Sequence, residues 1–444
     1  MLLEVEAFQR LSSRVRGGGL KAQLIRGVFG VGGLKLLSLL LTLCTSVLLA
    51  RGLGPEGYGK YAFVLSIVTM LALPVGPGIA QLVTREVAKH NHGGEWGLLR
   101  GALRRAHQWS VIGSAVIVVL IVSIFFNRAS WTVDDRWTML IFATAMLPLL
   151  GLNSIRNATL RGFGKASLSQ VPEQLIRPGL HLLIAFCLLL FNEINPTSAL
   201  VSQIVATSIA FWLGTLILLR LKPTEVGQSL PMYKDREWAY AILPFVLMTA
   251  VSTFNSHIGV LVLGVMGSDE GVAGFRIAVS GAMIVALSLV IVNVVIGPQI
   301  VRAHRDQDIV RLQRLSKLSA RGALAVALPL ALAFVFWGGQ IVSLVYGETY
   351  KDMVTLPLVI LAIGQLISVA FGSVGLLLTM SGFERHTLIG QIIALMVNAL
   401  ACLLFVPILG ATGAAVAVSL SLITWNVILA VSVFRKVGIR PSFI

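Results

Sequence analysis

The first long apolar segment of the chain carries a line of polar residues at helical spacing. Lys35, Ser38, Thr42 and Thr45 are separated by steps of three or four residues, and Ser46 lies beside the last of them. Such steps place side chains on one face of a helix. An ammonium group and several hydroxyls can bind a phosphate and the hydroxyl groups of a sugar. The segment therefore predicts a polar binding face on a helix that is otherwise mainly leucine.

A second apolar segment repeats this pattern in the other half of the chain. A shift of 214 residues carries Lys35, Ser38 and Thr42 onto Thr249, Ser252 and Ser256. We expect this second helix to contribute substrate contacts through Thr249, Ser252, Thr253, Ser256 and His257. The alternative is that small hydroxyl residues pack helix against helix, with His257 in an interhelical hydrogen bond.

Lys35 is the one charge that the pattern places well inside an apolar segment. It lies about eight residues from the expected helix start, roughly 12 Å at 1.5 Å per residue. A cation at such depth costs about 3 kcal/mol on insertion scales and marks a functional site by default. We expect Lys35 to face a cavity and bind substrate. The alternative is that its long side chain reaches the head groups at the membrane surface.

Three further polar residues share a face at the start of a later helix. Glu173, Arg177 and His181 are each four residues apart. A Glu–Arg pair at this spacing can simply close a helix end, or Arg177 can admit an anionic head group, and we include Arg177 in the predicted site. Arg51 and Arg276 lie near expected helix ends, where interface anchoring is their expected role.

The acidic residues are informative through their positions. All nineteen Asp and Glu fall in expected loops or at helix ends. An exporter of organic cations needs a buried carboxylate to attract its substrate. The expected cavity offers cations, hydroxyls and amides, which suit a phosphate or diphosphate and sugar hydroxyls.

These residues need membrane helices to position them. Only 12% of the 444 residues are charged and 56% are hydrophobic, whereas a soluble domain carries roughly 25% charged residues. Apolar runs long enough for a ~30 Å hydrocarbon core recur along the chain. We expect an all-α polytopic membrane protein of about twelve transmembrane helices, with spans near 27–50, 60–83, 109–126, 137–156, 174–191, 197–220, 238–265, 272–298, 321–345, 353–379, 386–407 and 411–434.

The positive charges predict the orientation of these helices. Of the 35 Lys and Arg, 28 fall on one side, in the terminal segments and the loops 84–108, 156–177, 220–237, 299–321 and 380–386. The positive-inside rule places that side, and both termini, in the cytoplasm. The net charge of +16 then reflects topology and contact with anionic membrane lipids, and nucleic acid is not an expected partner.

Several chemistries are excluded by what the sequence lacks. Cys44, Cys187 and Cys402 lie in apolar runs with no CxxC spacing, so no metal site or disulfide framework is expected. No glycine loop of the Walker type is present, so this chain does not use ATP directly, and no cofactor is expected. Residues 1–26 are basic and precede an apolar run too long for a signal peptide, which indicates a cytoplasmic lead-in.

Internal similarity divides the chain into two halves. The segment from Pro55 to Tyr61 overlays that from Asp269 to Phe275 at the shift of 214, and Gly162-Phe163 overlays Gly382-Phe383 at a shift of 220. We expect two parallel six-helix repeats, 1–222 and 223–444, with a cavity between them.

Several segments resemble a known family. The stretch from Leu48 to Tyr61 is similar to the first-loop signature of bacterial polysaccharide-biosynthesis flippases, and so are the stretches Val83–Glu86, Leu160–Lys165, Ser381–Arg385 and Pro407–Ala415. The family belongs to the superfamily of multidrug, oligosaccharidyl-lipid and polysaccharide exporters. The resemblance covers nearly the whole chain, and its motifs occur in the family's order.

The resemblance implies a V-shaped transporter of two six-helix lobes that opens alternately to each side. The implied substrate is an undecaprenyl-diphosphate-linked oligosaccharide for O-antigen or exopolysaccharide assembly in the bacterial plasma membrane. Polymerase machinery is a further implied partner. Cationic cavity residues are typical of the family, and Lys35 and Arg177 are the candidates here. Lipid II flippases of the superfamily usually have fourteen helices, so twelve argues against that branch.

Two other functions remain as alternatives. A multidrug exporter of the same fold is the first, and the lack of deep carboxylates counts against it. A membrane polysaccharide polymerase or ligase is the second. Such an enzyme needs a long outer loop with Arg, His or acidic groups, whereas the longest outer loop expected here runs only from about Asn127 to Arg136.

Overall fold

The computed structural model describes residues 20–127 and 135–440, and within them the chain is all α-helical, without a strand. Most of the predicted lead-in, 1–26, lies outside the described residues. The first half forms α2 (Leu20–Leu71), η1 (Leu73–Val75), α3 (Pro77–Gly93), α4 (Trp96–Asn127), α5 (Asp135–Thr144), α6 (Met146–Gly162), α7 (Ala166–Val171), η2 (Pro172–Ile176), α8 (Arg177–Leu190) and α9 (Pro196–Leu221). The second half forms α10 (Thr224–Gln228), α11 (Asp235–Met266), α12 (Asp269–Arg305), α13 (Ile309–Tyr346), η3 (Glu348–Tyr350), α14 (Lys351–Ala370), α15 (Val374–Met380), α16 (Glu384–Leu409) and α17 (Ala411–Val437).

Eleven helical stretches of the described chain are long and apolar enough to cross a membrane. The first of them, Gly33–Leu71, contains a break at Gly54, where φ is 69°. Only glycine adopts this backbone conformation readily, and Pro55 then starts a new helix. The chain is therefore an all-α polytopic membrane protein. The two parts of α2, before and after Gly54, count as one of these eleven stretches, whereas the sequence prediction of about twelve spans counted them as two. The arrangement in two six-helix repeats stays a prediction.

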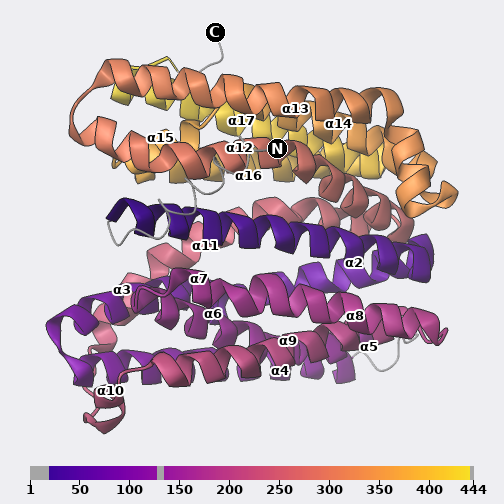
Figure 1. The fold of residues 1–444 in the computed structure, drawn as a ribbon. Helices are drawn as coiled ribbons and strands as arrows, with labels where there is room; N and C mark the ends of the chain where they lie inside the picture. The colour runs from indigo at the N-terminus through magenta and orange to yellow at the C-terminus, as the bar shows by residue number, and fades with distance from the viewer. Residues whose placement is uncertain (1–19, 128–134, 441–444) are drawn as a thin grey trace, which may run out of the picture.

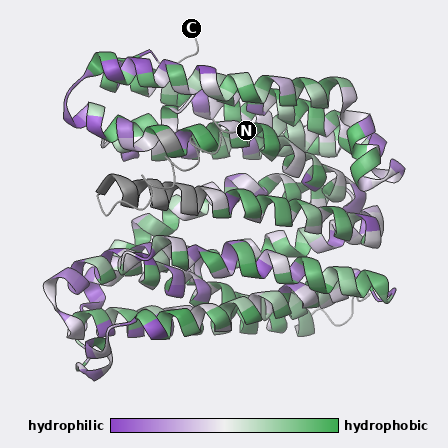
Figure 2. Ribbon diagram, viewed as in Figure 1, coloured by the Kyte–Doolittle hydropathy of each residue, from purple (hydrophilic) through white to green (hydrophobic). Residues whose placement is uncertain are grey.

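The long helices run side by side in two groups (Figure 1). Helices α3 to α10 form the first group and α12 to α17 the second, with α2 and α11 between them. Hydrophobic residues cover the middle of the helices, and hydrophilic residues gather at the two ends (Figure 2). We call the end that carries α3, α10 and α15 the basic end, because the loops there hold most of the Lys and Arg.

Helix α11 contacts both groups. Near its start, Trp238 packs with Leu82 of α3 and Ala102 of α4. Further along, Asn255 accepts a hydrogen bond of 2.8 Å from the amide of Asn398 on α16. The first part of α11 therefore belongs to the first group by packing, although it follows the midpoint of the sequence.

Helix α2 and the first group both contact the second group closely at the end opposite to the basic end. The Arg51 guanidinium donates to the backbone oxygens of Leu344 at 2.6 Å and Val345 at 2.9 Å. The Arg136 guanidinium forms an ion pair of 2.8 Å with Asp269 at the start of α12. These contacts close the space between the groups at this end.

Some helix boundaries differ from the sequence prediction. The expected span 60–83 is interrupted by η1 (Leu73–Val75), with Pro74 and Pro77 around the break. Helix α4 begins at Trp96 and α13 at Ile309, about three turns before the expected starts. These added turns carry many charged residues, so hydropathy alone does not mark them, although they are helical and continue beyond the apolar part.

One predicted element of the repeat has matching local structure. In both GF-containing turns a glycine has positive φ, 75° at Gly164 and 81° at Gly382. The backbone N–H of Lys165 donates to Leu160, and that of Phe383 donates to Leu378 in the same way. These hydrogen bonds align the turns at a shift of 218 residues rather than 220.

Candidate functional site

A cavity of about 250 Å³ lies between α2, α6, α8, α9, α11 and α12. Its polar lining comes from both halves of the chain and contains no carboxylate among the described residues. The hydroxyl-bearing residues of the wall are Thr42, Thr45, Ser46, Tyr58, Tyr61, Ser66, Thr69 and Ser280. An anion or a sugar is the kind of ligand that such a wall suits.

Two arginines provide the positive charge of this cavity. Arg177 begins α8, and Arg276 lies two turns into α12. Arg177 pairs with Glu173 behind the wall, with 3.3 Å between Nε and a carboxylate oxygen. Arg276 has no ion-pair partner in the part of the chain that the structure describes. The cavity therefore has a cationic side chain that is available to an incoming anion.

Two histidines of the cavity have buried ring nitrogens without a hydrogen-bond partner among the described residues. These atoms are Nε2 of His181 on α8 and Nδ1 of His257 on α11. Buried polar atoms in proteins nearly always have a partner. Because both residues line the cavity, a bound ligand or water can supply the missing partners.

The aromatic part of the wall is fixed by its own contacts. Tyr58 shares a hydrogen bond of 2.8 Å with Ser46 across the Gly54 break of α2. Its ring stacks with that of Tyr61 at a centroid distance of 6.3 Å, and Tyr61 in turn lies 6.4 Å from His181. Rings held in this way present a rigid surface to a ligand.

The position of Arg177 depends on a short π-helix, η2. A π-helical turn is rare and often occurs at a functional site. Glu173, within this turn, lies between Arg177 and the buried Arg156, whose guanidinium is 3.6 Å from the carboxylate. Arg156 also donates to the backbone oxygens of Ala210 and Phe211 on α9. Glu173 therefore links the cavity arginine to the interior of the first group.

The structure places some of the predicted site residues in this cavity and others outside it. Thr42, Arg177 and His257 line it. The hydroxyl of Thr249 donates to the backbone of its own helix, and so does that of Ser256. The predicted residues outside the cavity wall are Lys35, Ser38, Thr249, Ser252, Thr253 and Ser256.

Lys35 lies on the same helix as the cavity residue Thr42, toward the basic end. The two are seven residues apart, roughly 10 Å along a helix. The side chain of Lys35 is exposed, and Ser38 between them is half-buried. The stripe of polar residues therefore runs along α2 from an exposed lysine to the wall of the cavity.

Sequence reasoning missed several cavity residues. Arg276 was expected to anchor a helix end, because the predicted span began at residue 272. The structure begins α12 at Asp269 and places Arg276 on the cavity wall. The spacing of four residues between Arg177 and His181 indicates that both share a helix face, so His181 could have been predicted beside Arg177 on the cavity wall. Nothing in the pattern singled out Tyr58, Tyr61 or Gln203.

A family model described as "Polysaccharide biosynthesis protein" matches residues 24–304, which is more than half of the chain. The chain belongs to this polysaccharide biosynthesis family. The match includes both arginines of the cavity and the first helices of both halves. No curated protein matches the chain in sequence.

Solved structures of membrane transporters share the fold. An inward-facing multidrug resistance MATE transporter of the MOP superfamily has a TM-score of 0.76 at 16% identity, and the match covers 90% of this chain and 94% of that chain. The lipid II flippase MurJ in an inward closed conformation has a TM-score of 0.73 at 14% identity, covering 91% and 87% of the two chains. An outward-facing MATE transporter has a TM-score of 0.66 at 15% identity, covering 95% and 99%. At these identities the likeness concerns the fold.

Proposed function

We propose that this protein is a flippase that moves an undecaprenyl-diphosphate-linked oligosaccharide from the cytoplasmic to the outer leaflet of the bacterial plasma membrane. The observation that carries the proposal is the cavity, which has two arginines, two histidines and no carboxylate among the described residues. A diphosphate that enters this space meets Arg276, which has no competing anion. Family membership supports a role in polysaccharide assembly.

The proposed mechanism is alternating access between two six-helix lobes, 1–222 and 223–444, with the basic end in the cytoplasm. The contacts of Arg51 and Arg136 close the opposite end, so the head group enters from the basic end. A cavity of about 250 Å³ is below the ~300–1,000 Å³ of ordinary ligand sites. The lobes must therefore separate to admit the saccharide, and no covalent chemistry is needed. A polysaccharide polymerase is the proposed partner that receives the product.

A charge-assisted hydrogen bond to a phosphate is worth about 1.5–3 kcal/mol. Its loss corresponds to roughly 10- to 150-fold weaker binding. We therefore expect Arg276→Ala to weaken binding of the lipid-linked oligosaccharide by that factor. Arg302→Ala is the matched control, because Arg302 is an exposed arginine on the same helix, α12, away from the cavity.

The test measures binding of two ligands to purified protein in nanodiscs. One is the undecaprenyl-diphosphate-linked saccharide, and the other is a lipophilic organic cation, as a multidrug exporter would bind. The proposal predicts binding of the first, loss with Arg276→Ala, and no change with Arg302→Ala. Binding of the cation alone would support the exporter alternative instead.

A further inference from the structure

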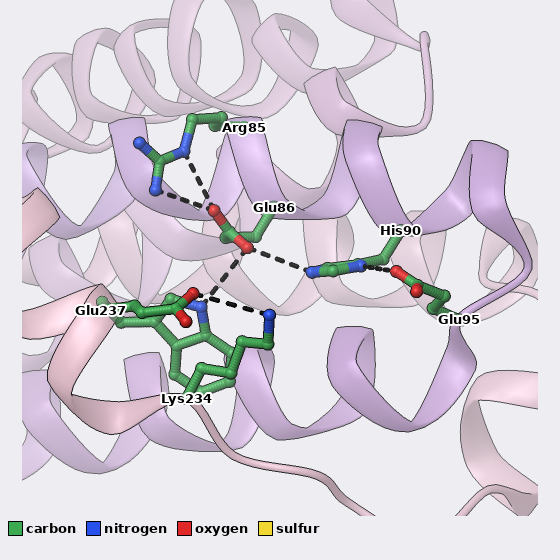
Figure 3. Close-up of polar contacts among 7 residues, drawn as sticks. Arg85, Glu86, His90, Glu95, Lys234 and Glu237 are labelled. Carbon is green, nitrogen blue, oxygen red and sulfur yellow. Dashed lines mark hydrogen bonds and ion pairs between the residues drawn. The ribbon is translucent and has the colours of Figure 1, made fainter.

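A buried histidine lies between two carboxylates at the basic end, outside the cavity. The side chain of His90, on α3, is 1% exposed. Its Nδ1 lies 2.5 Å from an oxygen of Glu95, and its Nε2 lies 3.1 Å from an oxygen of Glu86 (Figure 3). Both ring nitrogens therefore face carboxylate oxygens.

A neutral histidine between two ionised glutamates has a single N–H proton for two contacts. Hydrogen bonds at both ring nitrogens require a second proton. A neutral imidazole has a single N–H, and its other nitrogen carries a lone pair. If both carboxylates were ionised, that lone pair would face an anionic oxygen in a buried place, which is unfavourable. The contacts are satisfied when His90 carries two N–H groups, or when one carboxyl group is protonated.

The surroundings of Glu86 indicate which group holds the extra proton. Burial raises the pKa of this carboxyl group, but the Arg85 guanidinium and the hydrogen bonds from His90 and Trp238 outweigh it, so the pKa lies below its ordinary value. Glu86 is therefore ionised, and the extra proton is shared by His90 and Glu95 across the 2.5 Å contact between them. Glu95 is 53% exposed and gives a proton a path from water to the ring.

The same carboxylate joins α3 to α11. The indole N–H of Trp238 donates to the Glu86 oxygen that also contacts His90, at 3.3 Å. The Arg85 guanidinium lies 6.0 Å from the centroid of the Phe245 ring on α11. Gly78 of α3 lies so close to Val246 that an added Cβ would be 2.2 Å from its side chain. A change in the charge of His90 therefore acts directly on this helix contact.

Few other charged groups reach this network. From the start of α11, Lys234 and Glu237 approach it as a pair 3.6 Å apart (Figure 3). Helices α4 and α6 pack against this part of α3 with the apolar residues Leu99, Leu103 and Ile155. Val226 of α10 belongs to the same apolar cluster. The ion pair of Arg105 and Asp235, 2.8 Å long, holds the first turn of α11 to α4. Among these groups, only histidine ordinarily titrates near neutral pH.

We propose that Glu86, His90 and Glu95 form a proton-binding site whose occupancy holds α11 against α3. Uptake of a proton from the cytoplasmic side keeps Trp238 and Glu86 in contact. Loss of that proton turns a ring lone pair toward a carboxylate, and the contact is released. The contact is therefore present at low pH and lost as pH rises. Helix α11 also contacts α16 of the second group. Proton binding at this site therefore changes how firmly the second group is connected, through α11, to the first.

The experiment measures the distance between α4 and α11 by double electron–electron resonance of two spin labels. Arg104→Cys and Tyr240→Cys place labels on exposed positions of these helices, in a background where the exposed Cys44 and Cys187 are replaced by Ala. The full chain in nanodiscs is compared across about pH 5 to 8, where histidine changes charge. We expect the short-distance population to fall as pH rises.

Two variants should show no pH response, one with the high-pH distance distribution of the wild type and the other with the low-pH distribution. In His90→Gln both N–H donors lie on one nitrogen, whereas the two carboxylates contact different ring nitrogens of His90. The amide also takes up no proton near neutral pH, so its distance distribution should remain that of the wild type at high pH. Glu95→Gln gives His90 an amide that can donate or accept, so neutral His90 is satisfied and the low-pH distribution should persist. His92→Gln changes an exposed histidine on the same helix and should leave the response intact.

A wild-type distribution that does not change with pH would overturn the proposal, and so would a normal pH response in His90→Gln. The measurement follows a helix position and not polysaccharide. Its result therefore stands apart from the identity of the transported lipid, and the two proposals can fail separately.

Discussion

Arg177 of α8 and Arg276 of α12 line the same cavity, although they come from different halves of the chain. Arg177 is held from behind by Glu173, whereas Arg276 is in no ion pair among the described residues. A site built in this way changes when the halves move, because each half carries one of the two cations. A diphosphate bound between Arg177 and Arg276 would favour the arrangement in which the two halves lie close together around the cavity.

The closed contact at the opposite end depends on Gly59. An added Cβ there would lie 1.9 Å from the backbone oxygen of Asp269, and backbone cannot easily move away. We expect Gly59→Ala to hold α2 away from α12 and the second group at this end, and to stop transport. The measurement is the distance between spin labels at Glu56→Cys and Lys351→Cys, which should increase. Gly33→Ala is the control, because no atom lies within 4 Å of a Cβ there.

Glu173 is predicted to act through structure rather than through proton transfer. In Glu173→Gln the buried Arg156 loses its charged partner, which costs about 1 to 3 kcal/mol. We expect a lower Tm in detergent and an unchanged pH dependence of transport. Glu193→Gln, at an exposed position, should change neither. A transport rate that stops responding to pH in Glu173→Gln, at normal expression, would instead make this carboxylate a coupling group.

Lys35 remains a predicted contact for the head group on its way into the cavity. The residue is exposed on α2, about two turns from Thr42 toward the basic end. We expect Lys35→Ala and Lys35→Gln to fail to restore surface polysaccharide in a flippase-null strain, and Lys35→Arg to restore part of it. Membrane insertion should be normal, since the substitution removes a costly charge. Wild-type polysaccharide from Lys35→Ala at low, matched expression would show that Lys35 only reaches the lipid head groups.

The helical membrane fold could be predicted from the sequence, because a continuous run of about 20 apolar residues is enough to indicate a membrane helix. No knowledge of contacts between distant residues is needed. Of the residues predicted to bind substrate, Thr42, Arg177 and His257 lie on the cavity wall. Helical spacing indicates which side chains share a face but not where a cavity ends, and the role of these residues in binding stays a prediction. The cavity position of Arg276 was not predicted. The predicted helix began at residue 272, whereas α12 begins at Asp269, so Arg276 lies further from the helix end than expected. The His90 site was also out of reach, since Glu86 and Trp238 are far apart in sequence and meet only through packing.

Topology is a separate prediction that rests on the loop charges. Single cysteines at Ile194 and Glu348, at the opposite end, should react with an impermeant thiol reagent on intact spheroplasts. Single cysteines at Glu95 and Asp308, at the basic end, should react only after permeabilisation. The reverse pattern would place the basic end outside and contradict the proposed direction of transport. A third outer site, Trp131→Cys, lies outside the described residues.

The most direct measurement is transbilayer movement of a fluorescent undecaprenyl-diphosphate-linked saccharide in proteoliposomes that contain only this protein. We expect movement faster than in protein-free liposomes. We also expect roughly 10- to 150-fold slower movement at limiting substrate with Arg276→Ala, and a normal rate with Arg302→Ala. Movement no faster than in protein-free liposomes, with protein that is folded and correctly inserted, would contradict the proposed function. So would equal rates for the Arg276→Ala variant and the wild type.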